Sequence, residues 1–327
     1  MTIGVLVPTN GAHPEAPPHA RPIGRAALLL AREGIDVVFG DTVLDGRIHG
    51  LRAVEHGWEA VDGASMVGAH DRFPSQLRAD RFERIRAGLG GVELWNSLEF
   101  TMLCRDKLLS QQRLESLGIR MPCVEHDPSL FSARLAEWKR AFLKPRYGAL
   151  GIGVASVEPG SPLPSTRPGV VPSRPDPSIL QAAIAPPAGW ASRTVRVLLQ
   201  RTPSGGWFQH TPVVRQSRED PVANAARGAE VVAGPEALDD QCLGRIFDSV
   251  AAIAAAFNGM PEAERMVEAG VDLVLDEAME PWLIEVNSRP RGRLELMASQ
   301  RPDAYSSEHI EACARPLRVI AAGAKRD

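Results

Sequence analysis

Two short stretches near the C-terminal end of the chain alternate apolar and polar residues with a period of two, which predicts paired β-strands. They are Val271–Asp276 and Pro281–Val286, and the four residues between them are typical of a turn. If the two residues that flank this turn pair with each other, Asp272 lies directly opposite Glu285. The pattern therefore predicts a hairpin on which two carboxylates face each other.

Directly opposed side chains in a hairpin lie roughly 5 Å apart, so two carboxylates repel unless a proton or a cation lies between them. Asn287, two residues after Glu285, projects from the same face and adds an amide oxygen. This ligand set suits a hard cation, Mg²⁺ or Mn²⁺, whereas a surface hairpin with solvated acidic residues is the alternative. Arg289, Arg291 and Arg293 follow at once and favour the cation site, because guanidinium groups there could hold a polyphosphate or a carboxylate.

The N-terminal region has the pattern of a Rossmann-like half. Ile3–Pro8 is predicted to be a buried strand, Thr9–Arg21 a loop, Pro22–Glu33 a helix and Ile35–Phe39 the next strand. This order predicts a parallel sheet with right-handed crossovers. No GxGxxG motif follows the first strand, which argues against a nicotinamide cofactor.

The same region continues with further strands and a helix. Gly57–Ala69 contains another strand pair, Gln76–Leu89 is predicted to be helical, and Val92–Trp95 is predicted to be a strand. Asp71 and Arg72 stand at a strand end, where a binding pair and a structural ion pair are equally good interpretations.

A long amphipathic helix is predicted from Ser97, a typical N-cap residue, to Gly118. Lys107 lies in the middle of this helix. Taken alone, Lys107 is interpreted as a solvated helix lysine.

Ala141–Pro145 is predicted to be a strand, and Lys144 stands immediately before a glycine-rich segment, Arg146–Val154. The glycines at 148, 151 and 153 permit a backbone whose N–H groups surround phosphate oxygens. The segment is not a Walker loop, because it does not end in Gly-Lys-Ser/Thr. A plain hairpin turn is the alternative, and the adjacent Lys144 favours phosphate binding.

Two arginines stand in apolar, alternating stretches. Arg196 lies within Arg193–Gln200, and Trp207–Val214 leads to Arg215. The two side chains could meet on one face of a hairpin, where a buried guanidinium group needs an anion.

The remaining segments are predicted as follows. Ser156–Ser178 holds seven prolines and is expected to be an irregular connection, whereas Ile179–Ile184 is expected to be a strand that acts as a hinge between lobes. Asp239–Phe257 and Ser307–Ala321 are predicted to be helices.

Composition excludes several classes of protein. The 327 residues are enough for two or three subdomains, and a net charge of −3 gives no sign of nucleic-acid binding. Four scattered cysteines form no CxxC pair and eight scattered histidines form no zinc motif, so a reducing, cytoplasmic setting is expected. No signal peptide and no apolar run of about 20 residues is present, so no membrane association is expected.

Taken in order, these features resemble the ATP-grasp superfamily, its glutathione-synthetase-like branch, and within that branch the YheC/YheD-type proteins described as spore-coat-associated. The resemblance covers nearly the whole chain, and its most specific part is the IEVN motif with the upstream VD. The matching stretches are HDRFPS at 70–75, Asn96 through Lys107 to Pro122, RVLLQ at 196–200 and LIEVNSRP at 283–290.

The resemblance implies a mixed α/β (α+β) ATP-grasp fold, in which two lobes enclose ATP. It implies a Rossmann-like pre-ATP-grasp domain over residues 1–96, a small lobe with the glycine loop over 97–190, and a large lobe with the metal site over 191–327. The implied ATP-binding residues are Lys107, Lys144, Tyr147, Gly148, Gly151, Gly153, Gln181 and Ile184. The implied Mg²⁺ ligands are Asp272, Glu285 and Asn287, and the implied catalytic residues are Arg215, Arg196 and Arg291.

The chain departs from the YheC/YheD-type pattern at three places. Val195 stands where an acidic residue is usual, Arg227-Gly228 stands where two glycines are common, and the proline-rich segment at 156–178 is unusual. These departures leave the implied nucleotide site intact and concern the acceptor substrate.

The resemblance implies an ATP-dependent carboxylate–amine ligase that forms an amide or peptide bond through an acyl-phosphate. Phosphoryl transfer to a carboxylate needs charge neutralisation and positioning, which the predicted site offers. The alternatives are a nucleotide-binding protein with a structural or assembly role and a kinase on the same scaffold. The expected partners are small carboxylate and amine substrates, such as an amino acid or peptide, and a homodimer is a candidate assembly because dimers are the commonest.

Overall fold

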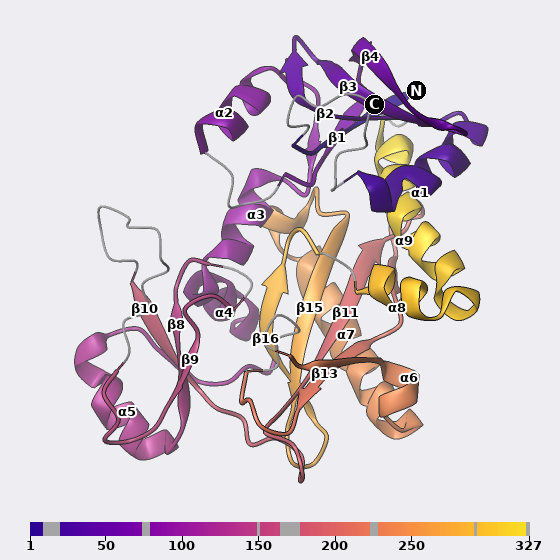
Figure 1. Cartoon of the computed structure of the whole chain (residues 1–327). Helices are drawn as coiled ribbons and strands as arrows, with labels where there is room; N and C mark the ends of the chain where they lie inside the picture. Colours follow the sequence, from indigo (N-terminus) through magenta and orange to yellow (C-terminus); the bar gives the residue numbers. More distant parts are fainter. Residues whose placement is uncertain are drawn as a thin grey trace.

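The computed structural model describes residues 1–8, 20–73, 79–148, 151–163, 177–222, 228–290 and 293–324. Three β-sheets follow one another along the chain, and helices lie against each of them (Figure 1). The first sheet lies at one end of the molecule, and the third sheet lies between it and the region around α5 (Phe131–Trp138).

The first sheet has six strands in the order β4-β3-β2-β1-β5-β6. The strands are β1 (Thr2–Leu6), β2 (Asp36–Leu44), β3 (Arg47–Val54), β4 (Gly57–Ser65), β5 (Gly68–Asp71) and β6 (Leu94–Trp95). β1 pairs in parallel with β2, as the sequence predicted, and β5 pairs in parallel with both β1 and β6. β3 was not predicted, and β3 and β4 extend the sheet in the antiparallel sense. The region is therefore a parallel unit with a β-hairpin added to one edge.

The last helix of the chain packs against this N-terminal sheet. α1 (Arg21–Arg32) buries Ile23, Ala27 and Leu30, and α9 (Pro302–Gly323) adds Leu317 and Ile320 to the same core. Arg318 of α9 forms hydrogen bonds of 2.7 and 2.8 Å with Glu33 beside α1. The two ends of the described chain consequently lie close together (Figure 1).

The second sheet has four strands in the order β7-β10-β8-β9, and all its pairings are antiparallel. The strands are β7 (Val124–Glu125), β8 (Ala141–Pro145), β9 (Ala155–Val157) and β10 (Ser178–Ala182). β10 confirms the strand expected at Ile179–Ile184 and lies inside the sheet between β7 and β8, whereas its role as a hinge stays a prediction. Residues 183–191 connect this sheet to the next.

The single helix expected from Ser97 to Gly118 is in fact two helices, α3 (Leu98–Arg105) and α4 (Lys107–Glu115). Asp106 has an extended backbone conformation, with φ −88° and ψ 95°, and its side chain caps α4 by accepting from Leu109 N at 3.1 Å. The Asp106 carboxylate also pairs with both Nε and Nη2 of Arg146. The helix breaks there because an aspartate that caps a helix and pairs with a distant arginine offsets the lost helical bonds.

The third sheet follows the order β14-β13-β11-β15-β16, and β12 pairs with β11 beside it. The strands are β11 (Ser192–Arg201), β12 (Trp207–Gln209), β13 (Val213–Ser217), β14 (Glu230–Ala233), β15 (Glu268–Leu275) and β16 (Pro281–Asn287). The helices of this region are α6 (Gly234–Ala237), α7 (Asp240–Asn258) and α8 (Leu294–Gln300), and α2 (Ala79–Ala87) lies in the first region.

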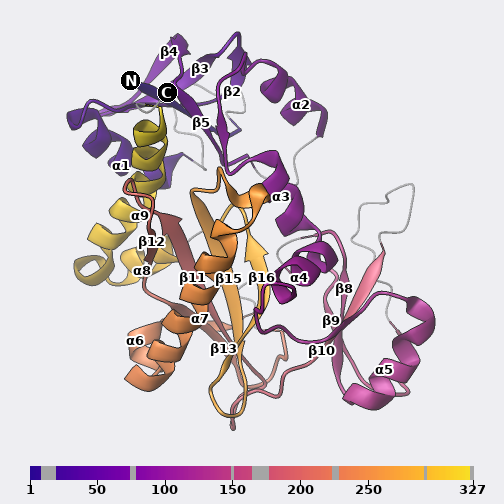
Figure 2. The same cartoon turned by 180° about the vertical axis from the view of Figure 1, so that it is seen from behind.

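The two faces of the third sheet have different roles. Helix α7 lies against one face of this sheet (Figure 2), and Val195 and Val197 of β11 belong to the same core cluster as Ile246 and Val250 of α7. The alternate residues of the same strand, among them Arg196, line a cavity. The period of two that predicted the strands thus separates a hydrophobic core from a polar cavity wall.

No helix in the described part of the chain is long and apolar enough to cross a membrane.

Candidate active site

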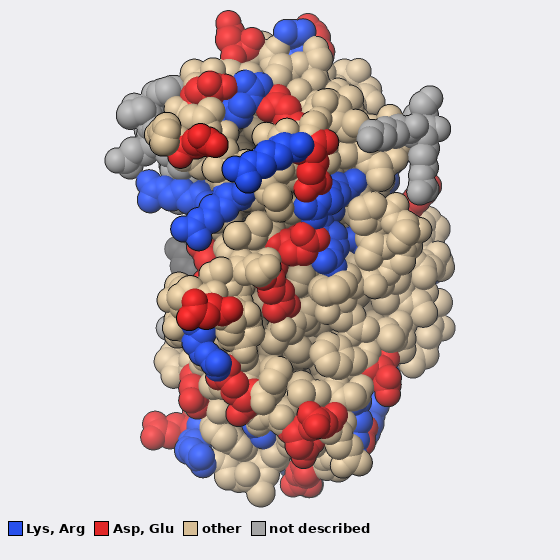
Figure 3. Space-filling model, turned by 90° about the vertical axis from the view of Figure 1, so that its right-hand side faces the viewer, with Lys and Arg blue, Asp and Glu red and all other residues tan. Residues whose placement is uncertain are grey.

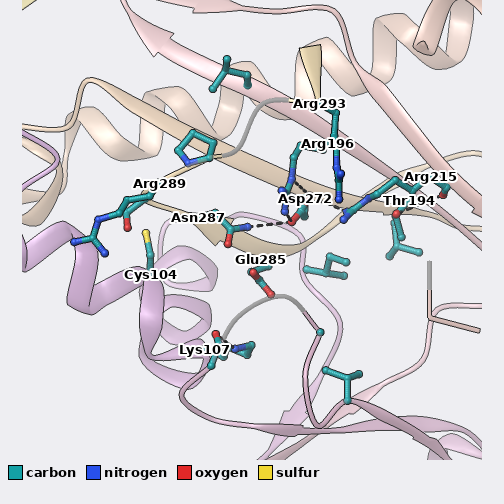
Figure 4. Close-up of a pocket in the computed structure, with 18 of the residues that line it drawn as sticks. Cys104, Lys107, Thr194, Arg196, Arg215, Asp272, Glu285, Asn287, Arg289 and Arg293 are labelled. Carbon is teal, nitrogen blue, oxygen red and sulfur yellow. Dashed lines mark hydrogen bonds and ion pairs between the residues drawn. The ribbon is translucent and has the colours of Figure 1, made fainter. Parts of the chain in front are cut away.

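A cavity of about 570 Å³ lies between the second and third sheets, and its lining extends to the end of β5 and to α9. Nine lysine and arginine side chains and four carboxylates line it, a surplus of five positive charges in a chain of net charge −3. Figure 4 shows the central part of this cavity, where side chains from β11, β13, β15 and β16 lie opposite Lys107. The cavity is therefore suited to an anionic ligand.

The hairpin of β15 and β16 places Asp272 opposite Glu285, which confirms the predicted pairing. The expected pairing of Asp276 with Pro281 is wrong, since Leu275 is the residue opposite Pro281. A β-bulge between the Leu273 and Asp272 pairs shifts the register by one residue and brings the two carboxylates opposite each other.

Asp272 is 4% exposed and has four hydrogen-bond donors around its carboxylate. Arg196 donates from Nε at 2.7 Å and from Nη2, Arg215 donates from Nη2 at 2.9 Å, and Asn287 donates from Nδ2 at 3.0 Å. Burial by itself raises the pKa of Asp272, but the charges of Arg196 and Arg215 outweigh it and hold this pKa below its usual value. The two arginines meet on one face as predicted, and the anion between them is Asp272.

The donor chemistry of this hairpin fits a divalent cation. Glu285 lines the cavity, and no hydrogen bond or ion pair joins it to another described residue. Asn287 directs its NH₂ group to Asp272, so its carbonyl oxygen is left for another partner. No group of three His, Cys, Asp or Glu residues suited to a metal occurs in the described ranges, so a cation here would rely on two carboxylates and an amide.

Two lysines face this hairpin from the other side of the cavity. Lys144 on β8 is half-buried and donates to Oε1 of Gln181 on β10, whereas Nζ of Lys107 donates to the carbonyl of Gly148 at 2.7 Å. Burial lowers the pKa of Lys144 to about 8, although the nearby Glu285 opposes this.

The glycine segment connects the antiparallel strands β8 and β9, and its residues 149 and 150 lie outside the described residues. Gly151 and Gly153 adopt positive φ values of 70° and 73°, which side chains rarely tolerate. Gly148, Gly151 and Ile184 line the cavity, as does Gln181. Tyr147 forms an isolated bridge with Asp106 instead, and Gly153 is not among the lining residues.

Of the three arginines after β16, the two that the structure describes point in different directions. Arg289 pairs with the buried Asp71 and points away from Asp272, whereas Arg293 lies beside Arg196 (Figure 4). Arg291 lies outside the described residues. The expectation that all three join the acidic pair is therefore wrong for Arg289, because Asp71 from the N-terminal region provides its counter-ion.

A second buried acidic residue at the far end of the cavity was missed in the sequence. Glu268 is 2% exposed, pairs with Arg72, accepts from Gln200 Nε2 at 3.1 Å, and lies 3.4 Å from Nε2 of His70. Burial raises the pKa of Glu268, but the charge of Arg72 and the contact with His70 lower it to about 2. Glu268 precedes Asp272 by four residues on the same strand, so the period of two that revealed Asp272 could have revealed it.

Asp71 and Arg72 each form a structural ion pair, one with Arg289 and the other with Glu268. They also join the first region of the chain to the third sheet. Of the two interpretations of this dipeptide, the contacts favour the structural one.

Comparison with solved structures identifies the class of this fold. The chain matches VanG D-Ala:D-Ser ligase from Enterococcus faecalis with a TM-score of 0.59 and 12% identity, over 98% of this chain and 99% of that one. It matches the D-alanine–D-alanine ligase from Coxiella burnetii with a TM-score of 0.59 and 12% identity, over 100% and 95%. It matches a RimK domain ATP-grasp protein from Sphaerobacter thermophilus with a TM-score of 0.54 and 15% identity, over 98% and 100%.

The fold is therefore the ATP-grasp fold, as expected from the sequence. Within this class, residues 179–311 match the family model of the YheC/D-like ATP-grasp proteins. No curated protein matches the chain significantly. The matched range runs from β10 into α9 and includes both arginines and the whole acidic hairpin.

Proposed function

We propose that this protein is an ATP-dependent carboxylate–amine ligase that forms an amide or peptide bond through an acyl-phosphate and releases ADP and phosphate. The observation that carries the proposal is the meeting of two charged walls in one cavity. Arg196, Arg215 and the acidic hairpin form one wall, and Lys107 and Lys144 form the other. Transfer of a phosphoryl group to a carboxylate needs this combination of cations and fixed acidic groups more than it needs a nucleophilic side chain.

In this proposal the nucleotide lies between the second and third sheets. Lys107 and Lys144 bind its phosphates, and the turn that contains Tyr147, Gly148, Gly151 and Gly153 covers them. Gln181 and Ile184 lie beside the adenine. Support comes from the cavity lining, which contains both lysines, Gly148, Gly151, Gln181 and Ile184.

Glu285, Asn287 and Asp272 would hold one or two Mg²⁺ or Mn²⁺ ions in the ligase. Such ions neutralise the charge of the β- and γ-phosphates during transfer. Support comes from the oxygen ligands on one hairpin face and from the carboxylate of Glu285, which has no partner among the described side chains.

Arg215 is the group proposed to stabilise the acyl-phosphate and the oxyanion formed when an amine attacks it, with Arg196 and Arg291 assisting. A fixed guanidinium group in a cavity stabilises such charge without reorganisation. Nε of Arg215 is buried and has no hydrogen-bond partner within the described ranges, so this side chain retains a donor for a ligand.

The solved structures of similar fold include ligases of D-alanine and D-serine, and we propose an amino acid or a peptide as the carboxylate or amine substrate here. An enzyme of this kind acts in the cytoplasm, where ATP is available.

The test is ADP release with ATP and Mg²⁺, screened against pooled amino acids and small acids with and without an amine donor. Release that requires both an acid and an amine establishes a ligase, and release with a hydroxyl acceptor alone indicates a kinase. Tight ATP binding without acceptor-dependent release indicates a nucleotide-binding protein without turnover.

In the same assay, Glu285→Gln is expected to lower metal-dependent turnover at least 100-fold, because an amide cannot replace the charge of a metal-binding carboxylate. Glu277→Gln, in the exposed turn of the same hairpin, is the matched control and keeps full activity. Full activity of Glu285→Gln would refute the metal assignment.

A further inference from the structure

The Asp272 carboxylate is saturated by groups of the protein itself. A carboxylate offers about four acceptor positions, and the two arginines and Asn287 supply four donors. Arg196 provides two of these donors in a bidentate pair, the strongest geometry between an arginine and a carboxylate. In this arrangement Asp272 has no lone pair to offer to a divalent cation.

Charge adds to this geometric obstacle. The guanidinium groups of Arg196 and Arg215 both contact Asp272 in a largely buried site, where charges are weakly screened. A divalent cation at Asp272 would lie beside two positive groups. It can bind only if these groups find another anion.

The phosphates of a nucleotide are such an anion. Both arginines line the cavity that Lys107 and Lys144 also line, so phosphates held by the lysines lie within the same space. Arginine binds phosphate oxygens in the same bidentate manner as a carboxylate. A guanidinium group that moves from Asp272 to a phosphate leaves the carboxylate free for the cation that the phosphate also attracts.

We propose that Arg196 is a built-in counter-ion of Asp272, which keeps this carboxylate closed to divalent cations until a polyphosphate binds in the cavity. This inference rests on the proposed nucleotide site and assigns Arg196 a positioning role there. Cation binding then requires the nucleotide, and the nucleotide-free protein does not bind a cation that would displace the phosphates from their position.

The experiment measures Mn²⁺ binding to the nucleotide-free protein by the electron paramagnetic resonance signal of free Mn²⁺. Wild type is expected to bind weakly, and Arg196→Met is expected to bind at least 10-fold more tightly because the competing charge is gone. Arg193→Met is the matched control, since Arg193 lies on the same strand and donates to the carbonyl of Ala237 instead. It should bind Mn²⁺ as weakly as wild type.

The double variant Arg196→Met/Glu285→Gln locates the gained site and is expected to lose the gain. Equal affinity of wild type and Arg196→Met, or a gain that survives in the double variant, overturns the proposal. If Arg196→Met does not fold, Asp272→Asn alone decides. It should leave nucleotide-free Mn²⁺ binding unchanged, and a 10-fold loss relative to wild type overturns the proposal.

These binding measurements do not depend on catalytic turnover. A protein that shows the Arg196 effect but no acceptor-dependent ADP release refutes the ligase and leaves the counter-ion inference standing. If the protein is a ligase but wild type and Arg196→Met bind Mn²⁺ equally well, only the counter-ion inference is refuted.

Discussion

Individual side chains in the cavity differ in how many of their hydrogen-bonding positions already have a partner in the protein. Asp272 has partners for all its acceptor positions, whereas Glu285 has none among the described residues. Lys144 is intermediate, since Gln181 accepts from it but burial disfavours its charge. The unsatisfied groups mark where a ligand gains the most by binding, because a buried polar group gains a partner at little further cost.

Lys144 leads to a prediction about proton uptake. Its pKa of about 8 means that it is largely neutral at pH 9, and a bound phosphate favours the charged form. Nucleotide binding at pH 9 should therefore take up close to one proton, and binding at pH 6.5 should take up none at this lysine. Calorimetry in two buffers of different ionisation enthalpy measures the uptake.

In that experiment Lys144→Met should remove the uptake at pH 9 and weaken nucleotide binding at least 10-fold. Lys139→Met, at an exposed lysine, is the control and should leave both unchanged. Equal heats in the two buffers with wild type at pH 9 would show that Lys144 does not bind the phosphates.

The helices and strands are joined at a few positions by polar side chains. Asp106 ends α3, caps α4 and binds Arg146, which follows β8. Asn96, fully buried at the end of the first region, donates to the carbonyls of Glu268 and Ser288 and accepts from the N–H groups of Val267 and Glu268. It therefore connects the start of β15 with the end of β16, and so holds the acidic hairpin in register.

We expect Asn96→Ala to lower the free energy of unfolding by roughly 3 kcal/mol, because four buried hydrogen bonds between its side chain and backbone groups are lost. Asn258→Ala is the matched control. Asn258 accepts hydrogen bonds from Arg201 and Trp207 at an exposed position, and its loss should cost less than about 1 kcal/mol. Urea unfolding followed by circular dichroism measures both, and equal effects would contradict the role of Asn96.

At the scale of the whole molecule, buried polar contacts join the regions of the chain to one another. On the face shown in Figure 3, acidic and basic side chains lie side by side, without one continuous basic patch. Inside, Glu268 of β15 contacts Arg72 after β5, and Gln200 of β11 donates both to Glu268 and to the carbonyl of Ala312 in α9. This network links the first sheet, the third sheet and the last helix.

The network makes the assembly of these regions sensitive to acid. The folded-state pKa of Glu268, about 2, lies below its ordinary value of 4.5. Its stabilising effect is therefore complete above pH 4.5 and is lost as the pH falls from 4.5 towards 2. It amounts to roughly 3 kcal/mol.

Glu268→Gln should destabilise the protein at pH 7 and flatten the fall in stability below pH 4.5, and thermal unfolding between pH 7 and pH 3 measures both effects. Glu264→Gln, at an exposed position near by, is the control and should follow the wild-type profile. A Glu268→Gln profile parallel to that of wild type would contradict the assignment.

The sequence alone was sufficient wherever the information lies in neighbouring residues. The period of two predicted β15 and β16, and the same period placed Arg196 on the polar face of β11. Such patterns are readable because a strand directs alternate side chains to opposite sides whatever surrounds it.

Only the tertiary structure decided which charges pair with which. Asp272 pairs with Arg196 and Arg215 rather than with a neighbour in sequence, Arg289 pairs with Asp71, and the break at Asp106 depends on Arg146, 40 residues later. The bulge that sets the register of the acidic hairpin is equally invisible in the alternation. Each of these outcomes depends on contacts between distant segments, and pairing energies between distant charges depend on burial and geometry that no local pattern contains.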